Sequence, residues 1–465
     1  MKHFIRSALS LLLLLSFLLT LSLPCLAAEE EPMILDARGA VLMDAAAGTV
    51  LFSLNPDMPL YVAGLTTMMT ALLAAEAVER GDVAWTDVVT ASGTSHSDIT
   101  ADAKIQNIVP GEEMTLENLL YCALVGGASE ACNIIAEFVS GSISQFVRDM
   151  NERAVELGCT GTNFVNTHGL PNENHFSTAY DMALIASEFV KHDFLCDAAN
   201  TISKDIPATN VSGVRHLSGT NYIIRTDYTR YYYSYASGIK ASYTDEAGYC
   251  LASSMKTEGS YVVSIVLGCR VQEADNGFYD IQSFIQTRKL FQWFNAHYSL
   301  RDVVSAIEPI TEIPVLLAEG TDTVVCCSDQ DLKLFLPTDL DIRKTYTREF
   351  TIYSEAEGAE PLTAPISRGQ VLGQMTVRDQ DGNTYGPFRL IANTDVAVSR
   401  IELMHQRFSD LLHSRGFRLV FWGVLLILVL YLAFVILYRV RRIRQRKAER
   451  AAERAAMAGR GKNGQ

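Results

Sequence analysis

The sequence predicts an α+β domain, followed by a small β-sandwich domain and one transmembrane helix. Residues 35–300 place two strands before a block of helices and then return to strands and a last helix, as in an antiparallel sheet with helices packed on it. From about residue 310 the pattern changes to short β-type runs separated by turns. Residues 417–438 form an apolar run of about twenty residues, enough to cross a bilayer.

The first predicted domain covers residues 29–300. Residues 35–53 have the pattern of two strands joined by a turn at Gly48. An Ala-, Leu- and Met-rich helix is expected over 65–80 and should stop at Gly81. Helices are also expected at 116–125, 129–139, 144–157, 178–191 and 280–297, and strands at 248–255 and 261–269.

The second predicted domain covers residues 310–400 and is all-β. Short runs rich in β-branched and aromatic residues, such as VLGQMTV and YGPFRLIA, alternate with turn residues. The pattern favours a β-sandwich. Residues 401–415 could form an amphipathic helix that leads into the membrane.

The N-terminal end has the pattern of an export signal. Lys2 and Arg6, a long apolar run and a small-residue stretch predict a signal peptide over residues 1–28. An uncleaved anchor is one alternative, because the apolar run is long. A lipid anchor on Cys25 is another, although Pro24 before it fits such a signal poorly.

The C-terminal end predicts the topology. The apolar run 417–438 is followed by a basic tail, residues 439–465. The positive-inside rule places this tail in the cytoplasm and residues 29–415 outside, so we expect a single-pass membrane protein.

Charge and composition exclude some functions. The net charge of -14 conceals an asymmetry, because residues 29–415 hold 26 basic and 51 acidic residues. Such an acidic surface repels nucleic acid, so no nucleic-acid partner is expected. No CxxC or His/Cys cluster indicates a metal, no cofactor is expected, and the cysteines after the signal are expected to be mostly free thiols.

Several segments that follow one another in order carry a family resemblance. They include AVLMDAAAGTVLFSLNPDMPL, AGLTTMMTALLAAE, PGEEMTLENLLYCALV, TNFVNTHGL and GIKASYTDEAGYCLASS. The series covers roughly residues 35–400 and resembles the D-alanyl-D-alanine carboxypeptidases, the low-molecular-weight penicillin-binding proteins. The resemblance implies a penicillin-binding/β-lactamase-like domain, a β-sandwich stalk, a C-terminal membrane attachment and a role in peptidoglycan metabolism.

The first two motifs of that family are altered here. Its S-x-x-K motif supplies a serine nucleophile and a lysine base, and these positions are held by Gly64 and Thr67. Glycine has no nucleophile, and threonine cannot act as the base at neutral pH. The S-x-N motif is replaced by Gly127, Ala128 and Ser129.

The third motif, K-T-G on an inner strand, keeps only its lysine. It is occupied by Lys240, Ala241 and Ser242. The resemblance implies an oxyanion hole made by the backbone N–H groups of Gly64 and Tyr243, which does not depend on side chains. Lys240 could still attract a carboxylate.

We therefore predict a pseudoenzyme with no intact catalytic residue. It would bind peptidoglycan stem peptides or act as a scaffold for cell-wall enzymes, with Lys240, Gly64 and Tyr243 at the binding site. The cleft could instead be empty, with Lys240 a leftover. The alternative is an active serine-type carboxypeptidase that trims stem peptides, using a substitute hydroxyl from Thr66, Thr67, Ser129 or Ser242.

Three further expectations concern single residues. Gly64→Ser should be harmless or slightly stabilising, because serine caps helix starts well. His168 is expected to shape a loop rather than to catalyse. A group of tyrosines is expected to pack together rather than to line a saccharide site, namely Tyr228, Tyr231, Tyr232, Tyr233 and Tyr235.

Overall fold

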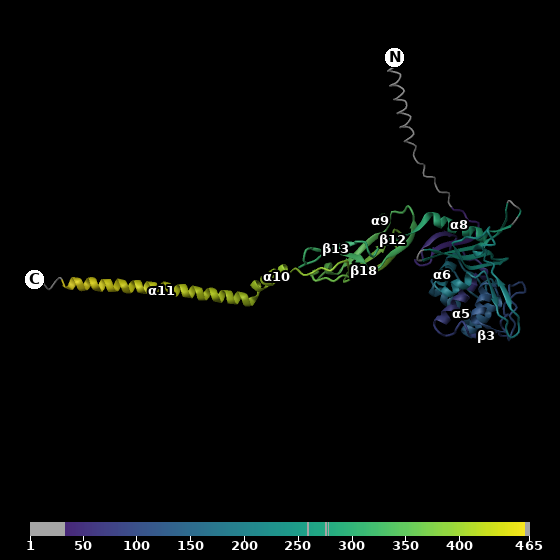
Figure 1. Cartoon of the computed structure of the whole chain (residues 1–465), viewed down its shortest axis with the longest axis horizontal. Coiled ribbons are helices and arrows are strands. Elements are labelled where there is room, and N and C mark those ends of the chain that lie inside the picture. The colour runs from purple at the N-terminus through teal and green to yellow at the C-terminus, as the bar shows by residue number, and fades with distance from the viewer. Residues whose placement is uncertain (1–32, 258–259, 275–276, 278, 461–465) are drawn as a thin grey trace, which may run out of the picture. The chain divides into compact units, whose positions relative to one another are not determined.

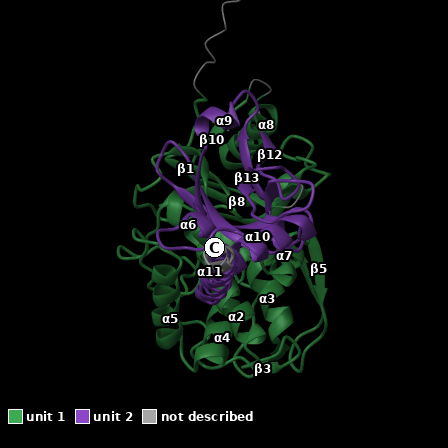
Figure 2. Ribbon diagram, turned by 90° about the vertical axis from the view of Figure 1, so that its left-hand side faces the viewer, with its two compact units in different colours: residues 1–298 green, residues 299–465 purple. Residues whose placement is uncertain are grey.

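The computed structural model describes residues 33–460, except 258–259, 275–276 and 278. The expected signal peptide at residues 1–28 therefore lies outside the described residues. The described chain forms two compact units, one ending at Tyr298 and the other beginning at Ser299 (Figure 2).

A five-stranded antiparallel sheet is the centre of the first unit. Its strand order is β2-β1-β9-β8-β7, with β1 at Gly39–Asp44, β2 at Val50–Leu54, β7 at Ala236–Thr244, β8 at Gly248–Thr257 and β9 at Ser260–Cys269. Side chains alternate along β9, because successive residues of a strand face opposite sides of the sheet. Val263 and Ile265 join the main core, whereas Val262 and Val266 are buried outside that cluster.

Helices pack on this sheet and on one another (Figure 1). Helix α6 (Ala179–Phe189) contacts β1 and β9, and α8 (Gln282–His297) contacts β8 and β9. Helix α2 (Thr67–Glu79) contacts the helices around it, and ten of its thirteen residues are buried. A helix that is apolar on every face is stable only when it is surrounded by protein. Its neighbours are α3 (Leu116–Leu124), α4 (Ser129–Ser140), α5 (Ile143–Glu156), α6 and α7 (Asp193–Ala199).

Short elements complete the first unit. The 3₁₀ helices are η1 (Ala63–Thr66) and η2 (Tyr222–Ile224). The two-stranded pairs are β3 (Val88–Thr90) with β4 (Glu113–Thr115), β5 (Ser203–Ile206) with β6 (Arg215–Ser218), and β10 (Val271–Glu273) with β11 (Tyr279–Ile281). The α+β prediction is confirmed, but these pairs and α7 are too short for a periodic pattern to reveal.

One expectation about the sheet is wrong. Lys240 was expected on an inner strand, but β7 is the last strand in the sheet order and has only β8 as a neighbour. The inner position was taken from the description of the family's third motif, and the local sequence does not tell which position a strand takes in a sheet.

The second unit is mainly β. Its five-stranded sheet has the order β13-β14-β18-β17-β16, and β12 pairs with β15. These strands surround a separate apolar core that includes Val324, Met375 and Leu390, as in a small β-sandwich. The bounds are Tyr298–Val304 for β12, Thr311–Pro314 for β13, Thr323–Ser328 for β14, Leu332–Pro337 for β15, Thr347–Ile352 for β16, Val371–Arg378 for β17 and Thr384–Ala392 for β18. Short helices lie at Ile342–Thr345 (α9) and Tyr353–Glu355 (η3).

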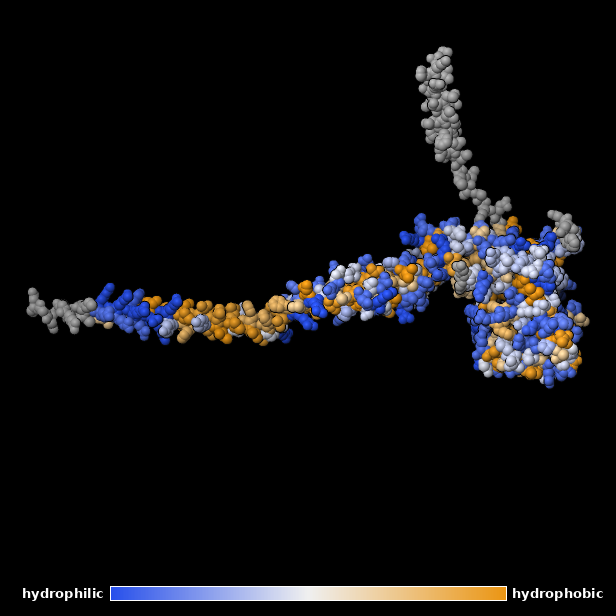
Figure 3. Space-filling model, viewed as in Figure 1, coloured by the Kyte–Doolittle hydropathy of each residue, from blue (hydrophilic) through white to orange (hydrophobic). Residues whose placement is uncertain are grey.

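Two helices follow the strands, α10 (Arg400–His413) and α11 (Arg415–Arg460). Among the described residues, α11 is the one helix long and apolar enough to cross a membrane. Figure 3 shows its apolar stretch in orange, followed by a hydrophilic basic stretch in blue. This pattern suits a membrane anchor.

Candidate functional site

Gly64, just before α2, lies in contact with Ser242. Gly64 lies in η1, directly before α2, and its backbone N–H donates a hydrogen bond of 2.8 Å to Ser242 Oγ on β7. A Cβ added at Gly64 would lie 2.7 Å from the same oxygen. The serine hydroxyl therefore occupies the space beside Gly64 where a side chain would begin.

Two threonines follow Gly64, and their hydroxyls are engaged within the fold. The Thr66 hydroxyl lies 2.8 Å from His175 Nε2 and donates to the carbonyl of Ala63 at 3.1 Å. Thr67 is buried, and its Oγ1 lies 3.8 Å from Cys132 Sγ on α4. No described contact pairs Thr67 with a group that would make its hydroxyl basic.

The segment between α3 and α4 carries the second altered motif. Gly127 has a φ of 71°, a conformation that suits glycine. A Cβ at this position would meet Lys104 Cδ at 2.9 Å, so the stem of Lys104 fills the space beside it. Ser129 is the first residue of α4, and its backbone N–H donates to the carbonyl of Lys104 at 3.0 Å.

Lys240 is the charged residue of β7 at this place. Its side chain is buried, and its Nζ donates to the carbonyls of Ala123 at 2.7 Å and Leu124 at 2.8 Å. The pKa of Lys240 is lowered to about 7, mainly by burial; Cys132 opposes this shift and the positive charge of Lys104 adds to it. The ammonium group is therefore poised between its charged and neutral forms near neutral pH.

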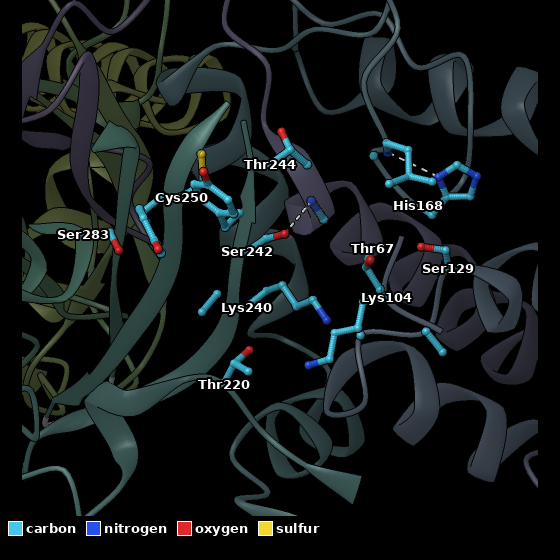
Figure 4. Close-up of a pocket in the computed structure, with 18 of the residues that line it drawn as sticks. Thr67, Lys104, Ser129, His168, Thr220, Lys240, Ser242, Thr244, Cys250 and Ser283 are labelled. Atoms are coloured by element: carbon cyan, nitrogen blue, oxygen red, sulfur yellow. Dashed lines mark hydrogen bonds between the residues drawn. The ribbon is translucent and has the colours of Figure 1, made fainter. Parts of the chain in front are cut away.

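These elements enclose one cavity of about 390 Å³. Figure 4 shows Lys240 and Lys104 reaching into it from opposite sides, with Thr67, Ser129 and Ser242 nearby. Its other lining residues are Gly64, Gly127, Ala128, Cys132, His168, Gly169, Leu170, Thr220, Tyr222, Ala241, Tyr243, Thr244, Tyr249, Cys250, Ile281, Ser283 and Phe284. Every residue assigned to the three altered motifs therefore lines the same cavity, together with Tyr243.

Sequence reasoning missed several lining residues. Lys104 belongs to no motif and lies in a loop, so nothing in its neighbourhood signals that it reaches this cavity. Tyr222 and Phe284 come from η2 and α8, and their rings lie 5.4 Å apart. Only the folded chain brings these three residues together.

His168 and the tyrosines take the following places. His168 lines the cavity, accepts a 3.2 Å hydrogen bond from the backbone N–H of Leu170, and has its pKa lowered to about 4 by burial, so its ring is neutral. Tyr228 stacks on Tyr222, and Tyr231 packs on Phe284. None of the five tyrosines named above lines the cavity, which is consistent with a packing role.

A group of possible metal ligands lies outside the cavity, among the described residues. Ligand atoms of Glu76, Glu188 and His192 lie within 4.8 Å of one another. Arg153 already contacts Glu76 at 2.8 Å and Glu188 at 3.5 Å. Because a guanidinium group supplies the positive charge there, the group is an ion-pair network.

Comparisons with known proteins agree on one family. Residues 26–271 match a family model described as D-alanyl-D-alanine carboxypeptidase. The D-alanyl-D-alanine carboxypeptidase DacF of Bacillus subtilis (strain 168) is 28% identical over 361 residues, covering 78% of this chain and 86% of the relative. DacC of Escherichia coli (strain K12), another D-alanyl-D-alanine carboxypeptidase, is 28% identical over 378 residues, covering 77% and 84%. The solved structure of penicillin binding protein 5 from Haemophilus influenzae is 25% identical with a TM-score of 0.58, covering 79% of this chain and 99% of that one.

Proposed function

The chain belongs to the D-alanyl-D-alanine carboxypeptidase family of peptidoglycan metabolism, and we propose that it is a non-catalytic member that binds stem peptides. The binding site is the cavity that contains Gly64 and Lys240. Lys240 would attract the terminal carboxylate of the peptide, and the backbone of Gly64 and Tyr243 would line the path of the chain.

The contact between Gly64 and Ser242 carries this proposal. Acyl transfer needs a nucleophile and a group that takes its proton. Gly64 supplies no nucleophile, and its N–H already donates to Ser242 Oγ at 2.8 Å. A substrate oxygen would have to displace that hydroxyl before Gly64 could stabilise an oxyanion. Thr67, at the position of the base, is an uncharged alcohol.

We also propose an arrangement in the membrane. The apolar part of α11 spans the bilayer, the basic stretch after it lies in the cytoplasm, and the first unit faces the cell wall. Digestion of sealed, right-side-out membranes with a protease tests this arrangement. Loss of the first unit with survival of the tail supports it, and the opposite pattern would contradict it.

Acylation, release and binding should be measured together on the full-length protein in detergent. Incubation with benzylpenicillin is expected to leave the intact mass unchanged, and a pentapeptide ending in D-Ala-D-Ala is expected to release no D-alanine. The same peptide should bind in isothermal titration calorimetry. Lys240→Met should weaken binding, and Lys256→Met, which removes an exposed lysine of β8 outside the cavity, should not.

Each other outcome has a definite meaning. A penicilloyl adduct that maps to Thr66, Thr67, Ser129 or Ser242 would show that the protein is an active enzyme with a substitute nucleophile. Neither reaction nor binding would show that the cleft takes no wall peptide, and a scaffold role for wall enzymes would then be the better explanation.

A further inference from the structure

The cavity gathers positive charge in an acidic protein. Its 22 described lining residues include two lysines and no aspartate or glutamate. Residues 29–415 hold 51 acidic and 26 basic residues, so a cavity without a carboxylate is unexpected from composition. Clefts lined by charge of one sign concentrate ligands of the opposite sign.

The ammonium group of Lys240 is one positive charge that lines the cavity. Its two described hydrogen bonds go to backbone carbonyls, which orient the ammonium but carry no net charge. A buried ammonium is costly unless an anion accompanies it. No carboxylate among the described residues forms a salt bridge with Lys240.

Lys104 brings the second charge from the other side. Its stem packs at Gly127, where the Cβ position lies 2.9 Å from Cδ and 3.5 Å from Nζ. The residue is exposed overall, yet desolvation around its ammonium end lowers the pKa of Lys104. The two ammonium ends lie close together in Figure 4, and each lysine lacks a salt bridge in the described part of the chain.

We propose that this cavity selects a peptide end that carries two negative charges, with Lys240 binding one carboxylate and Lys104 the other. Lys104 is then the residue that determines specificity. The inference rests on the proposed function and deepens it: among peptides with a terminal carboxylate, the cavity prefers one whose last residue is acidic. A cavity of about 390 Å³ is large enough for such a residue, since ligand pockets commonly start near 300 Å³.

The pairing of Lys240 with a carboxylate also couples peptide binding to proton uptake by the protein. Lys240 has a pKa of about 7 because it is buried, and an anion beside it favours the charged form. The other titratable groups at the cavity are Lys104, the thiols of Cys132 and Cys250, the imidazole of His168, and the phenols of Tyr222, Tyr243 and Tyr249. Burial raises the pKa of both thiols to about 11 and lowers that of His168 to about 4, so these three groups stay neutral at pH 8. At pH 8, a bound acidic peptide should therefore convert Lys240 from its neutral to its charged form.

Two peptides of equal size test the proposal on the full-length protein. N-acetyl-D-Ala-D-Glu has two carboxylates, and N-acetyl-D-Ala-D-Gln has one. In calorimetry the first should bind roughly tenfold tighter, the effect of one added charge pair near a protein surface after screening. At pH 8 its heat should change with the ionisation enthalpy of the buffer, showing uptake of up to one proton.

Substitutions of Lys104 distinguish its own contribution to binding from that of the overall charge of the protein. Lys104→Met keeps the stem at Gly127 but removes the charge, so the preference for the D-Glu peptide should fall to about onefold. Lys104→Arg should retain most of it, and the control Lys256→Met should retain all of it. Equal binding of the two peptides, or a preference that survives Lys104→Met, would overturn this inference and leave the proposed function standing. Failure of both peptides and of the D-Ala-D-Ala peptide to bind would overturn both.

Discussion

Two regions of the first unit treat charge in opposite ways. Near β6, Glu112 is buried, and Arg215 bonds it through two nitrogens at 2.6 and 2.8 Å, while Thr209 donates to it at 2.7 Å. Burial raises the pKa of Glu112, but the hydrogen bonds and charge of Arg215 outweigh it, so the net shift is downward. In the cavity, Lys240 is buried, and its described hydrogen bonds go to two backbone carbonyls.

Under the proposed function, the difference separates charge used for folding from charge available to a ligand. The charge of a carboxylate with a bidentate guanidinium partner is neutralised within the chain, so it attracts no further ion. The charge of a buried ammonium with no described counter-ion is not neutralised, so its desolvation lowers the stability of the fold. The experiments below alter one region at a time.

The largest effect is expected where the charge is balanced. Arg215→Met leaves Glu112 buried without a counter-ion and should lower the free energy of unfolding of the first unit by about 3–5 kcal/mol. Lys104→Met should change it by less than about 0.5 kcal/mol, because the Lys104 ammonium has no partner among the described residues. Urea denaturation at pH 7 measures both. Equal losses would mean that Lys104 is a structural charge.

A smaller effect is expected from pH. The pKa of Lys240 is about 7 in the folded protein against 10.5 for a free lysine, so the unfolded chain binds more protons between these values. The contribution of Lys240 to stability should therefore increase with pH, by roughly 1.5 kcal/mol between pH 7 and pH 8.5. The buried charge costs most below pH 7, and the cost falls as Lys240 loses its proton.

Lys240→Met is the variant that checks this slope. The stability of the wild type minus that of Lys240→Met should rise by roughly 1.5 kcal/mol between pH 7 and pH 8.5. This change with pH is independent of any constant loss through the unpaired carbonyls of Ala123 and Leu124. Lys256→Met is the control and should keep the slope. Unfolded cysteines begin to ionise in the same pH range and oppose the increase, because burial raises the pKa of thiols in the folded protein. The wild type and Lys240→Met both keep every cysteine, so this effect cancels in the difference between them. Equal slopes in the wild type and Lys240→Met would show that Lys240 does not titrate in this range.

The sequence predicts the elements of the fold better than the contents of the cavity. Helix α2 is apolar on every side, and α5 has one apolar face with a serine cap at Ser142, so both are visible in the local pattern. The three altered motifs could be placed at one cleft because the family resemblance indicates which distant segments of the sequence meet in the fold. The residue bounds of the domains stay a prediction.

Two features of the site could not be predicted, since they depend on contacts between distant segments. Lys104 fills the space at Gly127 from a loop with no motif, and Ser242 reaches Gly64 across 178 positions of sequence. Local propensity treats each of these residues alone. The prediction for Gly64→Ser was based on the helix-capping preference of serine. It took no account of the Ser242 hydroxyl that faces Gly64.

The smallest expected effect corrects that view. Gly64→Ser was expected to be neutral or stabilising, but its Cβ would meet Ser242 Oγ at 2.7 Å. The hydroxyl would have to turn away and give up its bond from the Gly64 N–H, so we expect a loss of about 1 kcal/mol instead. Ser242→Gly removes the obstacle, and the double variant should recover most of the loss, giving a coupling of about 1 kcal/mol in a double-mutant cycle of thermal melts. Neither variant should be acylated by penicillin, because Thr67 still cannot take a proton from the new serine. Independent effects of the two substitutions would show that the contact contributes nothing, and acylation of the double variant would show that this cleft needs only a nucleophile to become an enzyme.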